Sequence, residues 1–493
     1  MGISRTDLPF RGAMRHALCR AWMLAGLGLL AGCAGFEPLA APDTGAPERY
    51  FEAASTPTSA APVPKDWPRV FGSAELSKLV DDATIGNLDI AVAISRIAQA
   101  EAQAGISRAA LFPTLGGSAD VTHSQTPGTL KSSTGPFQST RSDQYSLGLT
   151  ASYELDLWGK NVATLEAARQ TAVQARFQRD VTALSTVAAV VNAYFAILAA
   201  QDRLAIAREN AVSAERVLTA IRGRLSVGTA TKLDVAQEES VVATQRASIP
   251  PLEQTISQSR STLAVLLGVA PEQLTIKGGS LRSLRSPRIA PGLPSQLLLR
   301  RPDIAVAETG LEAGKANVAA ARAAFFPTVD LTVKGGVEST LLRTLLRPDA
   351  EFYSLAAGLT QPIFDGGNLE NSLQYQRGKY AELLQTYRKA IIQAFSDVDT
   401  ALVAVKKTRE HEQLQAVVVE ASRRAYLITE ERLKEGTIDI VTVLQTQSTL
   451  FSAEDELVQI RLQRYQAIVS LFQALGGGWT RDDLAALPAG VAK

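Results

Sequence analysis

The chain has 493 residues, and its 50 lysine and arginine residues almost balance its 49 aspartate and glutamate residues. This balance leaves no charge excess to attract nucleic acid or an anionic membrane surface, and we expect no nucleic-acid partner. Past the N-terminus we expect no apolar run of about 18 residues that could form a transmembrane helix, so any membrane crossing must be made by strands.

The N-terminus has the pattern of a secretory signal. Four arginines precede an apolar run over residues 21–31, which is too short to span a bilayer. The run leads into Leu30-Ala31-Gly32-Cys33, which resembles the bacterial lipobox, in which the cysteine is acylated and becomes the first mature residue. We therefore expect a lipoprotein signal peptide at 1–32, beginning at Met1 or Met14, and a palmitate-bearing lipid on Cys33. The alternative is an ordinary signal peptide with an incidental cysteine.

The residues next to Cys33 give two further expectations. Position 34 is alanine and not aspartate, which in such lipoproteins implies sorting to the outer membrane. The only other cysteine, Cys19, lies inside the signal, so the mature chain has no disulfide. Residues 33–72 are rich in Pro, Ala, Ser and Thr, which favours an extended tether.

Two stretches then alternate between apolar and polar residues, after a helix predicted over 73–108 and ended by Phe112-Pro113. The first stretch runs weakly from Leu115 to His123, and the second runs from Tyr145 to Leu157. Its 13 residues could cross a bilayer if tilted. We expect the two strands to pair antiparallel around a loop at 125–144.

A long helix follows the second strand. No proline occurs between Lys160 and Val227, and the apolar residues recur with a mean spacing of about 3.6. Such a helix would extend roughly 100 Å. It should end at Val227-Gly228-Thr229, where glycine supplies a C-cap. A second helix is predicted from Thr231 to Leu267, bent at Pro250-Pro251, and a linker fills 269–302.

The same pattern occurs a second time. The segment from Arg108 to Pro113 reappears 214 residues later, whereas Tyr145-Ser146-Leu147 and Gly228-Thr229 reappear 208 residues later. The second hairpin loop is therefore expected to be six residues shorter. We predict repeats at 73–268 and 303–476 and a tail at 477–493. In the second repeat we predict strands over 329–337 and 353–363 and a long helix at Asn368–Glu435.

Four amphipathic strands cannot close a membrane barrel, and an open sheet edge in lipid leaves unpaired backbone groups that cost several kcal/mol each. Two copies would give eight strands filled by side chains, whereas three would give twelve strands with room for a channel. We therefore predict an α+β membrane protein with a hollow helical rod that continues a barrel. The polar strand residues that fit a wet lumen are Ser146, Thr150, Ser152, Glu154, Thr332, Lys334 and Thr360.

The order and doubling of several motifs resemble the TolC-like outer-membrane efflux protein family, of the NodT lipoprotein type, over essentially Cys33 to Trp479. These motifs are the repeat, the Gly-Thr turns, the Phe-Pro strand starts, the run from Leu299 to Ile304 with Ala307-Glu308, and the run from Leu475 to Trp479. The resemblance implies a homotrimer in outer-membrane lipid, with a twelve-stranded β-barrel, a long periplasmic α-helical barrel and an equatorial belt.

The resemblance also implies a function and partners. Such a protein is a passive exit duct for an inner-membrane pump, commonly of the resistance-nodulation-division (RND) class, and a periplasmic membrane-fusion adaptor. The alternative is the exit duct of a type I protein secretion system. The cargo is left open among drugs, metals, solvents and small acids.

Two groups of site residues follow from the resemblance. The turns that would meet the adaptor are Val227, Gly228 and Thr229 in one repeat and Glu435, Gly436 and Thr437 in the other; alternatively, their glycines only close helical hairpins, and both can be true. Asp234 matches a position that holds the closed tips together. The aspartates that line the family's constriction fall near Thr442 and Gln445, which are not acidic, and Asp439 is close but does not align. Asp234, Glu238 and Glu239 are equally consistent with ordinary solvated helix residues.

No motif for catalysis is complete. His411-Glu412 begins like a zinc-protease motif, but position 415 is glutamine. We therefore expect no enzyme, no cofactor and no metal site.

A freestanding porin would not need two long helices, and a soluble coiled-coil scaffold would not need the strands or the signal. Nothing in the pattern explains Leu341-Leu342 and Leu345-Leu346, which fall in a loop expected to face outside the cell.

Overall fold

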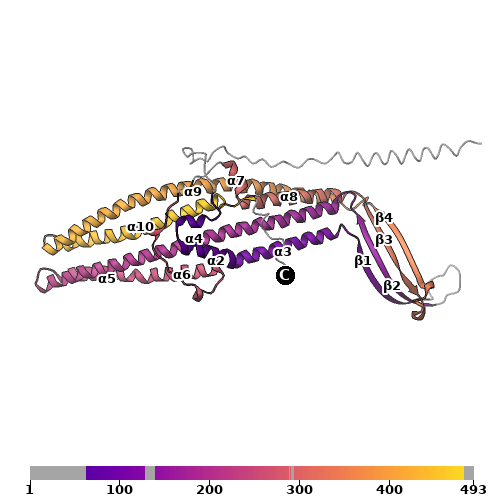
Figure 1. Ribbon diagram of the computed structural model, residues 1–493, viewed down its shortest axis with the longest axis horizontal. Helices are drawn as coiled ribbons and strands as arrows, with labels where there is room; N and C mark the ends of the chain where they lie inside the picture. The colour runs from indigo at the N-terminus through magenta and orange to yellow at the C-terminus, as the bar shows by residue number, and fades with distance from the viewer. Residues whose placement is uncertain (1–62, 128–138, 288, 290–293, 482–493) are drawn as a thin grey trace, which may run out of the picture. The chain divides into compact units, whose positions relative to one another are not determined.

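The computed structural model describes residues 63–127, 139–287, 289 and 294–481 (Figure 1). All of them belong to one unit of the fold, Thr44–Lys493. The expected signal peptide at 1–32, the lipid-bearing Cys33 and residues 482–493 lie outside the described residues.

The first half of the chain has the predicted order of helix, two strands, long helix and helical hairpin. Its elements are η2 (Trp67–Phe71), α2 (Ala74–Gly86), α3 (Leu88–Ala109), β1 (Thr114–Thr126), β2 (Thr140–Leu155), α4 (Lys160–Ser226), α5 (Lys232–Ala247) and α6 (Ile249–Leu267). The 67 residues of α4 confirm the predicted long helix. The hairpin's return helix is interrupted at Ser248, two residues before Pro250, because Pro250 and Pro251 fit the first turn of α6, where no helical N–H bond is needed.

The second half repeats this order after a linker. Its elements are η3 (Pro271–Gln273), η4 (Leu281–Ser283), α7 (Pro294–Arg300), α8 (Pro302–Ala323), β3 (Thr328–Ser339), η5 (Leu342–Thr344), η6 (Pro348–Ala350), β4 (Glu351–Thr360), α9 (Asn368–Glu435) and α10 (Ile440–Ala474). The bounds of α9 are those predicted. The prediction that the last strand reaches Ile363 is wrong: β4 ends at Thr360, and Pro362 has no N–H to continue the ladder.

The predicted helix over 73–108 is two helices, because the chain leaves helical geometry at Asn87, where ψ is 128°. The Asn87 side chain accepts a hydrogen bond from the Ile90 backbone N–H at 3.0 Å and so caps α3. Its Nδ2 also donates to the backbone oxygen of Leu266 at 2.8 Å. One asparagine thus ends one helix, starts the next and ties both to α6.

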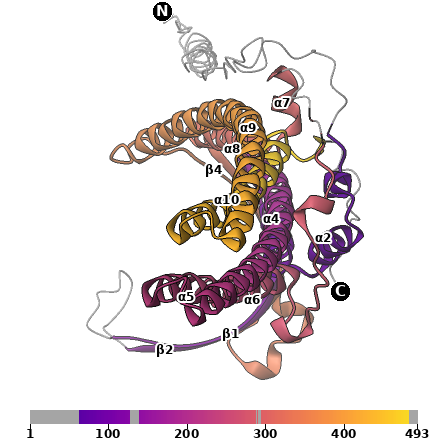
Figure 2. The ribbon, with the colours of Figure 1, turned by 90° about the vertical axis from the view of Figure 1, so that its left-hand side faces the viewer.

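The four strands form one antiparallel sheet in the order β1-β2-β3-β4 (Figure 1). The β2–β3 pairing, in which Leu147 lies opposite Val337, joins the two halves of the chain. Among the helices, α4 contacts α3, α5, α6, α8 and α10, whereas α9 contacts mainly α8 and α10 (Figure 2). The sheet and the helices therefore each combine elements from both repeats.

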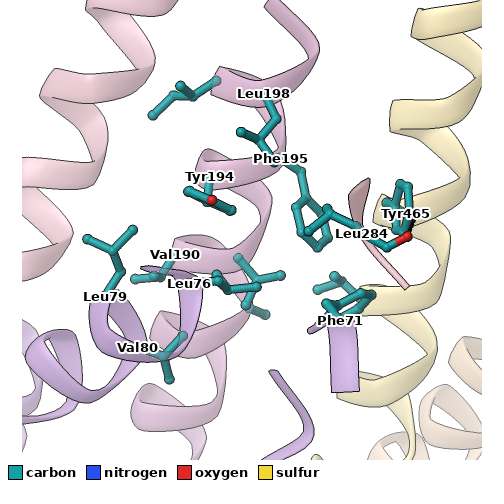
Figure 3. Packing of buried hydrophobic residues seen from close by; sticks show 14 of the residues in the cluster. Phe71, Leu76, Leu79, Val80, Val190, Tyr194, Phe195, Leu198, Leu284 and Tyr465 are labelled. Carbon is teal, nitrogen blue, oxygen red and sulfur yellow. Dashed lines mark hydrogen bonds between the residues drawn. The ribbon is translucent and has the colours of Figure 1, made fainter. Parts of the chain in front are cut away.

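The largest core cluster surrounds the middle of α4 (Figure 3). The Phe195 ring lies 5.0 Å from that of Phe71 and 5.3 Å from that of Tyr465, and the Tyr465 hydroxyl donates to the backbone oxygen of Leu284 at 2.9 Å. Trp67 and Phe71 of η2 are buried in this cluster. Residues 67–71 are therefore folded into the core and are not part of an extended tether. The reason is that burial of two large aromatic rings is strongly favourable in free energy.

The same stretch of α4 corrects another prediction. Residues 183–200 contain no charged side chain, and α4 is long and apolar enough to cross a membrane by length and composition alone. The expectation that no such run exists past the N-terminus is wrong. The most apolar window of α4 is 56% buried within the fold, because η2, α2, α6 and α10 pack around it.

Candidate functional site

The sheet has one apolar face that crosses all four strands. The register places Ala119 opposite Leu147 and Leu147 opposite Val337, and it places Val333 opposite Leu355. Because side chains alternate along a strand, these residues share one face. Leu355 is 77% exposed and Leu149 is 58% exposed. A large apolar surface is thus left uncovered, as expected for a surface that contacts lipid.

The opposite face of the sheet is polar. The register pairs Thr150 with Lys334, Ser152 with Thr332 and Glu154 with Asp330. Glu154 also forms an ion pair with Lys160 at the start of α4, at 2.6 Å. The residues predicted to line a wet lumen therefore do lie together on one face.

Both edges of the sheet are open within the described chain. β1 pairs only with β2, and β4 pairs only with β3. Each edge presents a row of unpaired backbone N–H and C=O groups over 13 residues in β1 and 10 in β4. Such edges in lipid require a partner strand.

The two predicted tips have the same geometry. Gly228 and Gly436 adopt left-handed φ values of 77° and 75°, and the threonine after each donates through its backbone N–H to the carbonyl of a helix's last turn. The bond from Thr229 to Arg224 is 2.9 Å, and the bond from Thr437 to Arg432 is 3.0 Å. The flanking Val227 and Glu435 are exposed as well. The glycines thus close both hairpins and leave both turns accessible.

The expected gate residues differ between the tips. Asp234 forms a capping box with Thr231: its carboxylate accepts from the Thr231 N–H at 2.7 Å, and the Asp234 N–H donates to the Thr231 hydroxyl at 3.2 Å. Asp439 stands at the start of α10 without a side-chain cap. Asp439, Thr442 and Gln445 are exposed, and within the described ranges none of them is hydrogen-bonded to Asp234. The geometry therefore gives Asp234 a capping role and brings no gate cluster together within one chain.

Two contacts hold the hairpins together. Arg224 in the last turn of α4 donates through Nη1 to the backbone oxygen of Leu433 in the last turn of α9, at 2.9 Å. Beside this bond lies an apolar cluster with residues from α4, α9 and α10: Val217, Ile221, Tyr426, Leu433, Ile440, Val443, Leu450 and Phe451. The Leu433 carbonyl also accepts from the Gly436 N–H at 3.1 Å, so Arg224 adds a second, charged donor to a carbonyl at the end of α9.

Glu238 of α5 is fully buried, which differs from the expectation of a solvated helix residue. The equally buried Gln447 of α10 faces it, but no hydrogen bond of ordinary geometry reaches either Glu238 oxygen within the described chain. Burial raises the pKa of Glu238 to about 7, and Gln447 lowers it only in part. Glu239, in contrast, is exposed and pairs with Arg222 at 2.6 Å. This burial could not be predicted from the sequence, because Gln447 and α10 belong to the other repeat and meet α5 only in the folded chain.

The remaining motifs have structural roles at the ends of the repeats. Arg301 pairs with Asp303 at 2.6 Å and with Asp397 at 2.9 Å. The Trp479 indole donates to Asp180 at 2.9 Å. Gly476 packs tightly against the backbone of Arg300, so an added Cβ would lie 1.8 Å from the Arg300 carbonyl oxygen. These contacts join α8, α9 and α10 to α4.

The His-Glu pair at 411–412 is also structural. Glu412 accepts hydrogen bonds from Arg461, at 2.8 Å, and from Arg464. Burial raises the pKa of Glu412, but the two guanidinium groups outweigh burial and hold it below its usual value. Across the described ranges, no group of three or more His, Cys, Asp and Glu side chains could hold a metal ion.

Comparison with known proteins gives a consistent result. A family model described as outer membrane efflux protein matches residues 79–269 and 293–477. The pyoverdine export outer membrane protein OpmQ of Pseudomonas aeruginosa is 38% identical over 465 residues, which cover 92% of this chain and 96% of that relative. The probable outer membrane lipoprotein SilC of Salmonella typhimurium is 29% identical over 92% of this chain and 97% of its own length. The solved outer-membrane channel OprN superposes with a TM-score of 0.82 at 29% identity, over 90% of this chain and 99% of that chain.

Proposed function

Because the chain belongs to the outer membrane efflux protein family, and so is the outer-membrane channel of a tripartite efflux system, we propose that three copies of it close one continuous duct. The single observation that supports this most is the sheet with two open edges, one apolar face and one polar face. Head-to-tail pairing of β4 with β1 of the next copy would satisfy both edges. Three copies give a twelve-stranded barrel with a wet lumen, whereas two give eight strands with a filled interior.

The long helices support the same assembly. α4 begins five residues after the last residue of β2, and α9 begins eight residues after the last residue of β4. They have 67 and 68 residues, so both can end at about the same level, about 100 Å from the sheet. A ring of such pairs would continue the barrel as a hollow periplasmic cylinder. A freestanding porin has no need of two matched helices of this length.

The assembly is tested on protein extracted from outer membranes in mild detergent. We expect native mass spectrometry to give three chains, and we expect unheated samples to migrate as a trimer in SDS gels. Cysteines placed one at a time along β1, each combined with one in β4, should cross-link neighbouring copies and form a ladder up to three chains. A stable dimer, or a soluble monomer, would exclude the proposed duct.

For cargo, we favour small molecules over secreted proteins. The observation is the similarity to OpmQ over nearly its whole length, a protein named for pyoverdine export. Selectivity would belong largely to the inner-membrane pump, of the RND class, and the duct would be passive. Deleting the chain and measuring the accumulation of fluorescent dyes and export of small chelators tests this. If the deletion abolished secretion of a protein and left small-molecule efflux intact, the type I secretion alternative would replace it.

We further propose that the two tips meet the periplasmic membrane-fusion adaptor and form the gate. Support comes from the exposed, equivalent turns at Val227-Gly228-Thr229 and Glu435-Gly436-Thr437. The duct would open when these hairpins separate from their neighbours. Cysteines that cross-link the tips of neighbouring copies should block export without disturbing the trimer. Normal export by fully cross-linked trimers would overturn the gating proposal. The acidic gate is not proposed, because Thr442 and Gln445 are uncharged and Asp234 caps α5.

Lipidation at Cys33 is also a proposal, supported by the Leu-Ala-Gly-Cys sequence. The mature N-terminus should carry labelled palmitate, and a Cys33→Ser variant should lose the label. If the wild-type chain carries no label, the anchor is excluded while the barrel stands.

A further inference from the structure

The loop between β3 and β4 has a composition that the duct does not explain. Its segment at 341–347, here called the Leu-Arg loop, has the sequence Leu-Leu-Arg-Thr-Leu-Leu-Arg. Leu341, Leu342 and Leu346 are 48%, 65% and 83% exposed. Three apolar side chains exposed within six residues indicate contact with an apolar partner and not with water.

The Leu-Arg loop has a defined conformation. The Thr344 hydroxyl lies 2.7 Å from that of Ser339 and donates to the Leu341 carbonyl at 2.9 Å. The Leu341 N–H donates to the Ser339 hydroxyl at 3.2 Å, and the Arg347 N–H donates to the Thr344 carbonyl at 3.2 Å. The leucines and arginines are thus presented on a fixed backbone at the end of β3.

Leu346 lines a groove of about 670 Å³ on the sheet. The groove is also lined by residues of the apolar face: Gly117, Ala119, Leu147, Leu149, Gly335 and Val337. No charged residue lines the groove. Gly117 and Gly335 leave space between the larger side chains. The loop that connects β3 and β4, in orange, lies next to β1 in Figure 2. The groove is therefore a depression on the apolar face of the sheet, and Leu346 of the loop forms part of its wall.

The two arginines of the Leu-Arg loop add positive charge close to Leu346 in the chain. Arg343 and Arg347 are exposed, and within the described ranges neither makes an ion pair or a side-chain hydrogen bond. The nearest acidic residues in sequence, Glu338 and Asp349, flank the segment, so 341–347 itself is basic. An arginine matches the geometry of a phosphate and binds it through charge-assisted hydrogen bonds.

We propose that the Leu-Arg loop and the groove bind one lipopolysaccharide molecule of the outer leaflet. Arg343 and Arg347 bind a phosphate of its lipid A, and one acyl chain lies in the groove against Leu346. The strand ends that carry this loop are opposite those that join the long helices, so the loop lies on the outer side of the membrane. The inference rests on the proposed function, because the groove faces lipid only when the sheet is part of a barrel wall.

The test measures lipid that is bound to the trimer. Wild-type trimer extracted in mild detergent should retain about one lipopolysaccharide per chain in native mass spectrometry. The double variant Arg343→Gln/Arg347→Gln should bind it about tenfold more weakly, because charge-assisted hydrogen bonds to phosphate are lost. Arg141→Gln is the matched control: it removes the same charge from the same end of the sheet, where Arg141 donates to Gln125, and it should retain the lipid.

A second variant fills the groove without touching the charges. A Cβ at Gly117 would meet only the Leu149 side chain at 3.5 Å, an ordinary contact, so Gly117→Val should fold and displace the acyl chain. At Gly336 an added Cβ would stand 2.2 Å from the Leu147 backbone oxygen, and that position is avoided. We expect Gly117→Val to form trimers that retain several-fold less lipid.

The outcomes separate this inference from the duct itself. Delipidated trimer in nanodiscs is titrated with lipopolysaccharide or with phosphatidylglycerol. Preferential binding of lipopolysaccharide that is lost in both variants supports the proposal. Equal binding of phosphatidylglycerol, or equal retention by the wild type and the double variant, overturns it even when trimers export normally. If no trimer forms at all, the proposed function fails first.

Discussion

The two long helices are equal in length but unequal in burial. α4 and α9 begin 208 residues apart, at Lys160 and Asn368, so Phe195 of α4 corresponds to Val403 of α9. Phe195 is fully buried, whereas Val403 is 38% exposed. The difference arises because α2 and the linker helix η4 pack on α4, and Phe71 of η2 packs on Phe195. The two repeats of the chain therefore have the same helix lengths and turns, but most of the central core packs around α4 of the first repeat.

The largest expected effect tests this inequality directly. Phe195→Ala should lower the free energy of unfolding by about 3–5 kcal/mol, because it removes a ring packed against Phe71 and Tyr465. Val403→Ala, at the equivalent position, should cost under about 1 kcal/mol. The guanidinium chloride midpoint of the helical circular dichroism signal measures both. Equal losses would show that the two helices share the core equally.

The second comparison sets Glu238 of α5 against its equivalent in α10, Thr446. Thr446 is satisfied by Thr429 at 2.8 Å, whereas Glu238 is buried with a pKa raised to about 7. A carboxyl whose folded pKa exceeds its unfolded value contributes stability that is complete below about pH 4.5 and is lost as pH rises to about 7. The loss should reach about 3 kcal/mol at most.

This prediction is measured as a difference between proteins, since other groups also titrate. Between pH 5 and about 7.5, Glu238→Gln should gain stability relative to the wild type, because the variant keeps a neutral side chain at every pH. The control is Glu239→Gln, which alters an exposed residue paired with Arg222 and should leave the pH profile unchanged. A wild-type profile parallel to that of Glu238→Gln would show that Glu238 is solvated when the copies assemble.

The regular part of this fold was predictable because it depends on local periodicity. The alternation around Tyr145, the 3.6 spacing after Lys160 and the doubled Gly-Thr turns predicted the strands, the long helices and the hairpins. Features that depend on distant contacts were not predictable. The helix break at Asn87 depends on a bond to Leu266, and the burial of Trp67 depends on contact with Phe472, whose ring lies 4.9 Å away.

The candidate site shows the same division. The tips and the two faces of the sheet followed from turn residues and period-two alternation. The buried Glu238 and the Arg224 contact did not, because both are made across the two repeats. The apolar stretch at 183–200 is hard to recognise in the sequence, because small and hydroxyl residues such as Ser185 and Thr186 interrupt it without introducing any charge.

A third comparison concerns the tip arginines, which are also 208 residues apart. Arg224 of α4 donates to the Leu433 carbonyl, whereas the exposed Arg432 side chain makes no such contact in the described chain. Arg224→Ala should loosen the end of α9 by about 1.5 kcal/mol, which raises amide hydrogen exchange at 432–437 roughly tenfold. Arg432→Ala should raise it less than about twofold. If the two variants behave alike, the contact does not hold the hairpins together.

The smallest expected effect compares the N-cap residues of the return helices. Thr231 caps α5 through a capping box with Asp234, whereas Asp439 precedes α10 without a side-chain cap. Thr231→Ala should therefore cost about 1 kcal/mol and speed exchange of the amides at 232–235 about fivefold. Asp439→Ala should cost only about 0.3 kcal/mol, through the helix dipole. If Asp439→Ala changes export while leaving exchange at 440–443 unchanged, its carboxylate acts at the mouth of the duct and not in the stability of α10.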